Sequence, residues 1–249
     1  MSRLDVALTE RKLAPSRSAA ASLIKNGQVT VNGTAVTKPS HEVEDGDTVA
    51  VLDGDSGKYV SRGGLKLEKA LSFFRVDPAG LTCCDIGAST GGFTDCLLKN
   101  GAKKVYAVDC GHGQLHPSLI GDGRVVSLEG VNAKALTCDT LGEKADLCVM
   151  DVSFISQVKL YPAVCSVLKP GGRFISLIKP QFEVGRSGIG KGGIVKNDKI
   201  REKAKDDVIA CAALHGLACK GVTLSPIKGG DGNTEYLALF MKEDTHDEN

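Results

Sequence analysis

From residue 60 onward, short apolar runs alternate with amphipathic stretches, and this alternation restricts the fold more than any other feature. The apolar runs have the length of strands and cover residues 81–87, 103–109, 124–130, 146–151, 173–179, 218–224 and 235–241. The amphipathic stretches predict helices over 64–74, 91–101, 157–168 and 198–216. Strands and helices that alternate with short turns predict a mostly parallel sheet covered on both faces. We therefore expect a Rossmann-like α/β domain with a mostly parallel seven-stranded sheet.

The first 55 residues have a different pattern, typical of a small α+β module. Residues 1–41 carry six basic groups against two acidic ones, whereas residues 42–55 carry six acidic groups and no basic one. We expect a short helix capped by Ser2 and a second helix from Pro15-Ser16 to Gly27, both before any strand. Asn32-Gly33 between two β-branched runs predicts a hairpin, and a further strand follows over 47–52.

The polar, glycine-containing segment DGDSGK at 53–58 separates the two patterns. We therefore expect a module at 1–55, a linker at 56–60, a large domain at 61–242 and a polar tail at 243–249.

The chain has the composition of a soluble globular protein, with 42% apolar residues and no run of about 18 of them. The N-terminus lacks the continuous apolar core of a signal peptide. We expect a cytoplasmic protein that neither spans a membrane nor is exported. The nine cysteines form no C-x-x-C pair, so their spacing supports neither zinc nor disulfides, and we expect most of them in the core.

The turn after the first predicted strand of the large domain is a candidate cofactor loop. It contains Asp85, Gly87, Ala88, Ser89, Gly91, Gly92 and Phe93, a spacing that does not match the G-x-G-x-x-G of dinucleotide sites. The next strand ends in Asp109, 22 residues after Gly87, where a carboxylate can bind both ribose hydroxyls of an adenosine. Together they suit S-adenosylmethionine. The alternative is that Gly91 and Gly92 only cap a helix and Asp109 is a solvated strand end.

A second glycine-rich segment, Gly185 to Gly192, has the spacing of a phosphate-binding P-loop up to Lys191. Gly192 stands where that motif needs a magnesium-binding Ser or Thr, and no convincing helix begins at the lysine. The segment is better interpreted as a lid or an RNA-contacting loop with Arg186, Lys191 and Lys196.

These features resemble a known family over nearly the whole chain. Residues 2–52, with the pattern LxxALxxxxLAxSRxxAxxLIxxGxVxVNG, resemble the S4 RNA-binding domain, and residues 60–241 resemble FtsJ-like methyltransferases. The motifs SRGGLKL, DIGASTGGFTD, DVSFIS, IKPQFE and GKGGIV together resemble the TlyA family. That family is often labelled hemolysin, and its better-supported activity is 2′-O-methylation of cytidine in ribosomal RNA.

The resemblance implies a catalytic set that matches Lys66, Asp151, Lys179 and Glu235. Lys179 would act as the base or would orient the ribose hydroxyl, because a lysine is ordinarily protonated at neutral pH. Asp151 would hold this lysine, and Asn132 is a weaker candidate for the adenine side of the cofactor. The alternative is a surface salt-bridge cluster, because charges at strand ends are common.

Ribosomal RNA or a ribosomal subunit is the implied partner, bound by the N-terminal module through Arg3, Lys12, Arg17 and Lys25. Two other functions stay open at this point: a noncatalytic RNA-binding or ribosome-assembly factor, and a pore-forming hemolysin. The sequence offers the latter no spanning helix and no amphipathic strand array.

Overall fold

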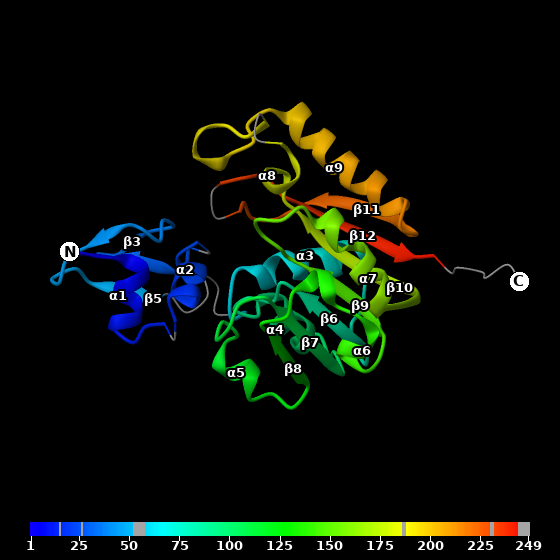
Figure 1. Cartoon of the computed structure of the whole chain (residues 1–249), viewed down its shortest axis with the longest axis horizontal. Coiled ribbons are helices and arrows are strands. Elements are labelled where there is room, and N and C mark those ends of the chain that lie inside the picture. The colour runs from blue at the N-terminus through cyan, green and yellow to red at the C-terminus, as the bar shows by residue number, and fades with distance from the viewer. Residues whose placement is uncertain (15, 26, 52–57, 186–187, 230–231, 244–249) are drawn as a thin grey trace, which may run out of the picture.

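The structure is a computed structural model that describes residues 1–14, 16–25, 27–51, 58–185, 188–229 and 232–243. A small N-terminal module lies beside a larger α/β domain (Figure 1). The expected boundary after residue 55 and all but the first residue of the expected tail lie outside the described residues, as do Pro15 and Arg186.

The N-terminal module combines two helices with short antiparallel strands. Its elements are β1 (Ser2–Arg3), α1 (Leu4–Glu10), α2 (Arg17–Lys25), β2 (Val29–Val31), β3 (Thr34–Ala35), β4 (Glu42–Val43) and β5 (Val49–Val51). The predicted hairpin is confirmed, since β2 pairs antiparallel with β3 and both turn residues have positive φ, 50° at Asn32 and 79° at Gly33. The buried side chains of Leu4, Leu8 and Ile24 join the helices to β2 in one small core.

The expectation that Ser2 caps the first helix is wrong. Ser2 lies in β1, which pairs with β4, so a strand precedes both helices. The first N–H groups of α1 are bonded instead to carbonyls of the loop before β4, from Leu4 to His41 at 2.7 Å and from Asp5 to Pro39 at 3.1 Å. A helix start supplied with such acceptors needs no capping side chain. Two-residue strands are too short to produce a periodic signal.

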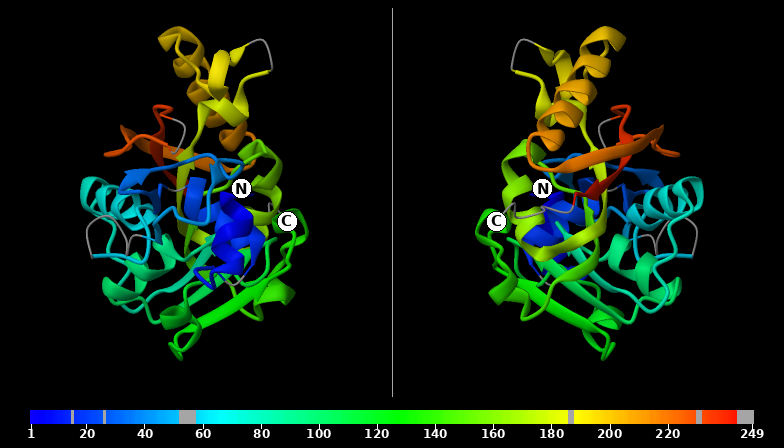
Figure 2. Two further views of the ribbon diagram at one scale, coloured as in Figure 1. Left: turned by 90° about the vertical axis from the view of Figure 1, so that its left-hand side faces the viewer. Right: turned by 90° about the vertical axis from the view of Figure 1, so that its right-hand side faces the viewer.

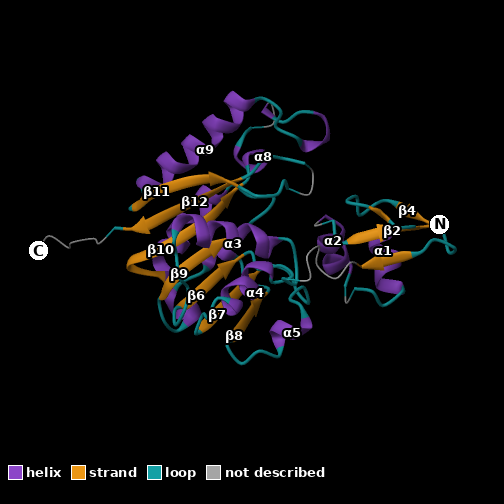
Figure 3. Cartoon of the chain, turned by 180° about the vertical axis from the view of Figure 1, so that it is seen from behind, coloured by secondary structure: helices purple, strands orange, loops and turns teal. Residues whose placement is uncertain are grey.

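The larger domain contains the predicted seven-stranded sheet. Its strands are β6 (Thr82–Ile86), β7 (Lys104–Asp109), β8 (Val125–Glu129), β9 (Ala145–Met150), β10 (Leu168–Ile178), β11 (Leu217–Leu224) and β12 (Tyr236–Lys242). The order is β11-β12-β10-β9-β6-β7-β8, parallel from β8 to β10, with β12 antiparallel to both of its neighbours. The carboxyl ends of the parallel strands face the N-terminal module (Figure 3).

Helices cover both faces of this sheet. On one face lie α3 (Gly63–Phe74), α4 (Gly92–Lys99) and α5 (Pro117–Ile120). On the other lie α6 (Cys138–Leu141), α7 (Tyr161–Val167) and α9 (Asp198–Ala213). The single helix predicted over 157–168 is divided into a 3-10 turn, η2 (Gln157–Leu160), and α7, because Pro162 lacks an N–H group and suits the first turn of a helix.

The chain between β10 and α9 rises above the sheet (Figure 2) and contains α8 (Pro180–Glu183) and the 3-10 turn η4 (Lys191–Gly193). The next helix begins only at Asp198, whereas a P-loop requires a helix that starts at its lysine. The glycine-rich segment is therefore not a P-loop.

The cysteines are all free, and Cys83, Cys84, Cys96 and Cys148 are buried as expected of small core residues. The expectation that most of the nine lie in the core is wrong, because Cys110 is exposed and the remaining four are only partly buried: Cys138, Cys165, Cys211 and Cys219.

Candidate active site

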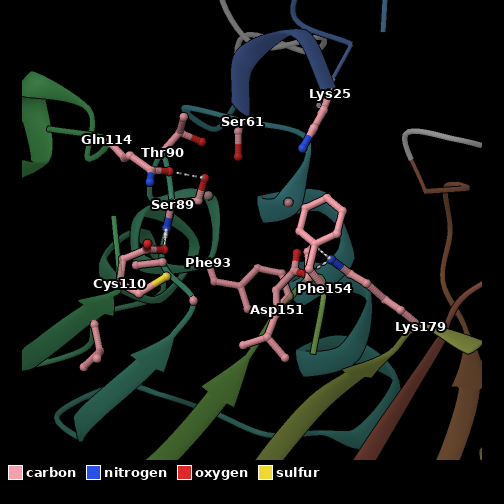
Figure 4. Close-up of a pocket in the computed structure, with 18 of the residues that line it drawn as sticks. Lys25, Ser61, Ser89, Thr90, Phe93, Cys110, Gln114, Asp151, Phe154 and Lys179 are labelled. Atoms are coloured by element: carbon pink, nitrogen blue, oxygen red, sulfur yellow. Dashed lines mark hydrogen bonds and ion pairs between the residues drawn. The ribbon is translucent and has the colours of Figure 1, made fainter. Parts of the chain in front are cut away.

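A cavity of about 500 Å³ lies between the carboxyl edge of the sheet and the N-terminal module (Figure 4). The glycine turn after β6, the end of β7 and the segments after β9 and β10 form most of its wall. Helix α2 of the module supplies Ser18, Ala21 and Lys25 to the same wall. The two parts of the chain therefore enclose one site.

The glycine turn brings the backbone close to the end of β9. Gly87 has a φ of 86°, and a Cβ atom there would lie 2.5 Å from the carbonyl oxygen of Asp151, so only glycine fits. The N–H of Ser89 donates to Asp109 Oδ2 at 2.8 Å, and the N–H of Gly111 donates to Oδ1 at 2.7 Å. These two bonds fix the carboxylate at the end of β7, in the cavity wall.

Seven of the nine residues expected at the cofactor line this cavity: Gly87, Ala88, Ser89, Gly92, Phe93, Asp109 and Asn132. The side chain of Asn132 also accepts the N–H of Lys134 at 3.0 Å, so it begins the 3-10 turn η1 (Ala133–Ala135) as well.

Asp85 and Gly91 are not in the wall, contrary to expectation. Asp85 is fully buried, where its Oδ2 accepts a hydrogen bond from Thr94 at 2.6 Å, and burial raises its pKa to about 7. Gly91 is the left-handed N-cap of α4, and a Cβ atom there would lie 2.2 Å from Leu119. Asp85 is thus bonded to α4, and Gly91 begins that helix, as the helix-capping alternative states.

Two lysine–carboxylate pairs meet at the opposite end of the cavity. Lys179, which follows β10, lies with its Nζ 2.5 Å from Asp151 Oδ1 and donates to Ser153 Oγ at 2.9 Å. Burial acts to raise the pKa of Asp151, but the charges of Lys179 and Lys66 outweigh it and the pKa is lowered. The carboxylate is therefore held ionised.

Lys66, in the first turns of α3, donates to Glu235 Oε2 at 2.6 Å. Glu235 precedes β12, and only 2% of its side chain is exposed. Lys66, Asp151 and Lys179 line the cavity, whereas Glu235 lies behind Lys66. The four residues are thus brought together as predicted, in buried or half-buried pairs rather than in a cluster at the open surface.

The four basic residues expected to bind RNA have different surroundings. Arg3 and Arg17 both pair with Asp5, and Lys12 is exposed in the turn after α1. Lys25 reaches the cavity mouth, where its Nζ lies 4.3 Å from the centre of the Phe154 ring (Figure 4).

Sequence reasoning did not single out Phe154, although it belongs to the DVSFIS motif. Its backbone is left-handed, with a φ of 64°, and the residue is 73% exposed at the cavity mouth. A bulky residue in this conformation is an outlier whose strain points to function. The DVSFIS motif could have drawn attention to Phe154, but the exposure of its ring is visible only in the folded chain. Gln114 and Lys228 also line the cavity and were not predicted.

Comparison with known proteins agrees with this architecture. The family model of FtsJ-like methyltransferases matches residues 59–242, and that of the S4 domain matches residues 2–49. The chain is 42% identical, over 98% of its length and 90% of the relative's, to the 16S/23S rRNA (cytidine-2′-O)-methyltransferase TlyA of Mycobacterium tuberculosis. The chain belongs to the TlyA family.

Other members of the TlyA family carry a different name. Hemolysin A of Brachyspira hyodysenteriae is 46% identical over 96% of this chain and 99% of its own. A solved structure from Streptococcus thermophilus that is also named as a hemolysin is 43% identical, with a TM-score of 0.76 over 98% of this chain and 89% of its own.

As an FtsJ-like TlyA-family member, the chain is a methyltransferase that uses S-adenosylmethionine. No helix among the described residues is long and apolar enough to cross a membrane. In the described part of the chain, no group of three or more His, Cys, Asp or Glu side chains is placed to hold a metal ion.

Proposed function

We propose that this chain transfers a methyl group from S-adenosylmethionine to the 2′-hydroxyl of a cytidine in ribosomal RNA. One observation carries the proposal: Lys179, Asp151 and Lys66 line the same cavity as the glycine turn and Asp109, and Glu235 pairs with Lys66 from behind the wall. The name of the Mycobacterium tuberculosis relative supports the substrate, and the S4 domain supports an RNA partner.

The donor atoms at the glycine turn suit the cofactor. Each oxygen of the Asp109 carboxylate accepts one backbone N–H and keeps a lone pair, so the group can also accept both ribose hydroxyls. Gly87, Ala88 and Ser89 would pass beside the methionine portion, and Asn132 and Cys110 would lie towards the adenine. Bound S-adenosylmethionine would supply an electrophilic methyl group at the lysine end of the cavity.

We assign Lys179 to the reacting hydroxyl. Its ion pair with Asp151 favours the charged ammonium, which can hold the ribose oxygen in line with the methyl group and stabilise the negative charge that develops on that oxygen. Loss of a proton from Lys179 Nζ to solvent before the RNA binds would leave an amine that can accept the hydroxyl proton, while the Asp151 carboxylate stays ionised. Asp151 serves both roles by fixing the position of Nζ.

The cavity mouth is suited to a nucleotide turned out of its helix. Exposed aromatic rings stack on unpaired bases, and Phe154 offers such a ring beside Lys179. Lys25 and Lys228 place positive charge at the same mouth, where phosphates of the bound RNA would lie. Arg3, Lys12 and Arg17 would extend the RNA contact over the module.

The decisive experiment maps 2′-O-methylated nucleotides in ribosomal RNA treated with the protein and S-adenosylmethionine. We expect methylated cytidines with the wild-type chain and, at the same reaction time, strongly reduced methylation when Lys179 is replaced by alanine. A noncatalytic assembly factor would bind ribosomal subunits and leave the RNA unmodified, which would refute the proposal. Leakage of dye-filled liposomes measured in parallel tests the activity implied by the name hemolysin.

A further inference from the structure

We propose that Asp5 is a positioning residue of the RNA-binding surface, whose buried carboxylate holds Arg3 and Arg17 side by side for phosphate contacts. The inference deepens the proposed function and rests on it. It predicts that an acidic residue strengthens binding to a polyanion.

The geometry joins two helix starts through one carboxylate. Arg3, the N-cap residue of α1, donates from Nε to Asp5 Oδ1 at 3.0 Å and from Nη2 to Oδ2 at 3.1 Å. Arg17, the first residue of α2, donates from Nη2 to the same Oδ2 at 3.0 Å. The hydrogen bonds from Arg3, reinforced by Arg17, hold the pKa of Asp5 at about 2, so the carboxylate stays ionised at any physiological pH.

Burial divides this cluster into a fixed anion and two accessible cations. Only 7% of the Asp5 side chain is exposed, against 50% for Arg3 and 61% for Arg17. An arginine has five N–H donors, and the bonds to Asp5 use two from Arg3 and one from Arg17. The other donors can approach a phosphate while the side chains stay in place.

Arg11 shows the contrasting use of an arginine in the same module. Its guanidinium donates to the main-chain oxygens of Asp47 at 2.7 Å and Glu44 at 3.0 Å, which ties α1 to the turn before β5. Arg11 therefore holds the module together. Arg3 and Arg17 share a side-chain carboxylate and remain half exposed or more.

Asp5 strengthens RNA binding by holding the side chains of Arg3 and Arg17 in place before the RNA arrives. A free arginine loses side-chain freedom when it binds a phosphate, and that cost is already met when a neighbour fixes its rotamer. The opposing effect is repulsion between the carboxylate and the RNA, which the two adjacent guanidinium groups and salt weaken. We infer that positioning outweighs repulsion.

The test measures binding of fluorescently labelled 16S and 23S rRNA transcripts to full-length variants over a range of salt concentrations. We expect Asp5→Asn to weaken binding about three- to tenfold, which is less than the roughly 5- to 150-fold cost of two newly mobile arginines because removing the carboxylate also removes its repulsion of the RNA. Its plot of log affinity against log salt should also be shallower, because fewer phosphates are neutralised. Asp5→Glu, which keeps the charge, should recover most of the affinity.

The matched control is Glu10→Gln on the same helix. Glu10 is exposed and makes none of the ion pairs found among the described residues, so its removal should leave binding equal or slightly tighter. In a background with Arg3→Gln and Arg17→Gln, Asp5→Asn should no longer weaken binding, because the carboxylate then has no arginine to position. A module that is merely unfolded would instead lose binding in every background and lower the melting temperature.

Tighter or unchanged binding by Asp5→Asn, with an unchanged salt slope, would overturn the inference. An equal loss in the double-arginine background would overturn it as well. If the wild-type chain itself bound neither transcript, the proposed function would fail rather than the role of Asp5. If Asp5→Asn does not fold, two other variants decide. Asp5→Glu should keep most of the wild-type affinity, and the variant with Arg3→Gln and Arg17→Gln should bind more weakly with a shallower salt slope. Wild-type binding by the double-arginine variant would overturn the inference.

Discussion

The two edges of the seven-stranded sheet carry the same kinds of side chain but use them differently. At the amino edge, Lys104 pairs with Glu143 at 3.0 Å and Lys169 pairs with Asp146 at 2.6 Å, all of them partly exposed. Glu143 and Asp146 also accept bonds from a tyrosine hydroxyl and a backbone N–H, so these pairs tie neighbouring segments together. Within the part of the chain that the structure describes, these four side chains do not line either of the two cavities found.

At the carboxyl edge, Lys66, Lys179 and Asp151 line a cavity, and the ion pairs of both lysines are more deeply buried than those at the amino edge. Surface ion pairs stabilise a protein by about 0–1 kcal/mol, whereas breaking a buried pair costs about 3–5 kcal/mol. Depth and an adjoining cavity, rather than the presence of charges at strand ends, distinguish a site from a structural cluster. The following variants test that distinction, and the first three are each matched by a variant at the amino edge.

The largest expected effect is on the rate of methyl transfer. Lys179→Ala should lower the single-turnover rate about 10²- to 10⁴-fold, because the group that aligns or deprotonates the hydroxyl is lost. Lys179→Arg should not restore the rate, since a planar guanidinium cannot replace a point-charge ammonium. Transfer of tritiated methyl groups to ribosomal subunits measures both, with separate titrations of cofactor and RNA that should remain unchanged.

Lys169→Ala is the matched variant at the amino edge and should methylate at the wild-type rate. A wild-type rate in Lys179→Ala would show that this lysine is also a structural strand-end charge.

The next effect is on stability. Lys66→Ala leaves Glu235 buried without its cation and should lower the free energy of unfolding by about 3–5 kcal/mol. Lys104→Ala at the amino edge should lower it by no more than about 1 kcal/mol. Urea denaturation of both variants measures the difference. Equal losses of unfolding free energy in the two variants would mean that the burial of an ion pair does not distinguish the two edges of the sheet.

A smaller effect is expected on cofactor affinity. Asp109→Ala should weaken binding of S-adenosylmethionine by about 1.5–3 kcal/mol, the range for hydrogen bonds to a charged group. Asp122→Ala, which removes the partner of Arg124 before β8 at the amino edge, should leave the affinity unchanged. Titration calorimetry measures both variants. Unchanged affinity in a folded Asp109→Ala protein would remove Asp109 from the cofactor site.

The smallest effect concerns pH. Because burial raises the pKa of Asp85 from 3.8 to about 7, the folded state keeps a proton that the unfolded state loses. This residue should therefore reduce stability progressively as pH rises from about 4 to about 7. Asp146, whose net pKa is lowered, acts in the opposite direction and only at lower pH.

Asp85→Asn should remove the Asp85 contribution, so that melting temperatures at pH 5 and pH 8 lie closer together than in the wild type. Thermal denaturation at both pH values shows the change. The same pH dependence in the variant would mean that Asp85 is ionised in the folded protein.

The comparison of edges also shows how far the sequence leads. Alternating periodicity predicted every strand of the large sheet, and strand ends predicted that Asp109, Asp151 and Lys179 would share one edge. Burial was not predictable, because it depends on which helices and loops cover that edge. Asp85 lies near the end of one apolar run and Asp109 ends the next, yet Asp85 is fully buried and bonded to α4 whereas Asp109 lies in the cavity wall.

The sequence by itself determined the alternation of strands and helices, the position of the glycine turn and the residue types available at the carboxyl edge. These are local properties, since propensity and periodicity act over a few residues. Only the tertiary structure decided that Lys66 meets Glu235 across 169 residues and that α2 closes the cavity with Lys25. Such contacts follow from the order of strands in the sheet and from how the module packs against it, and neither leaves a local pattern in the chain.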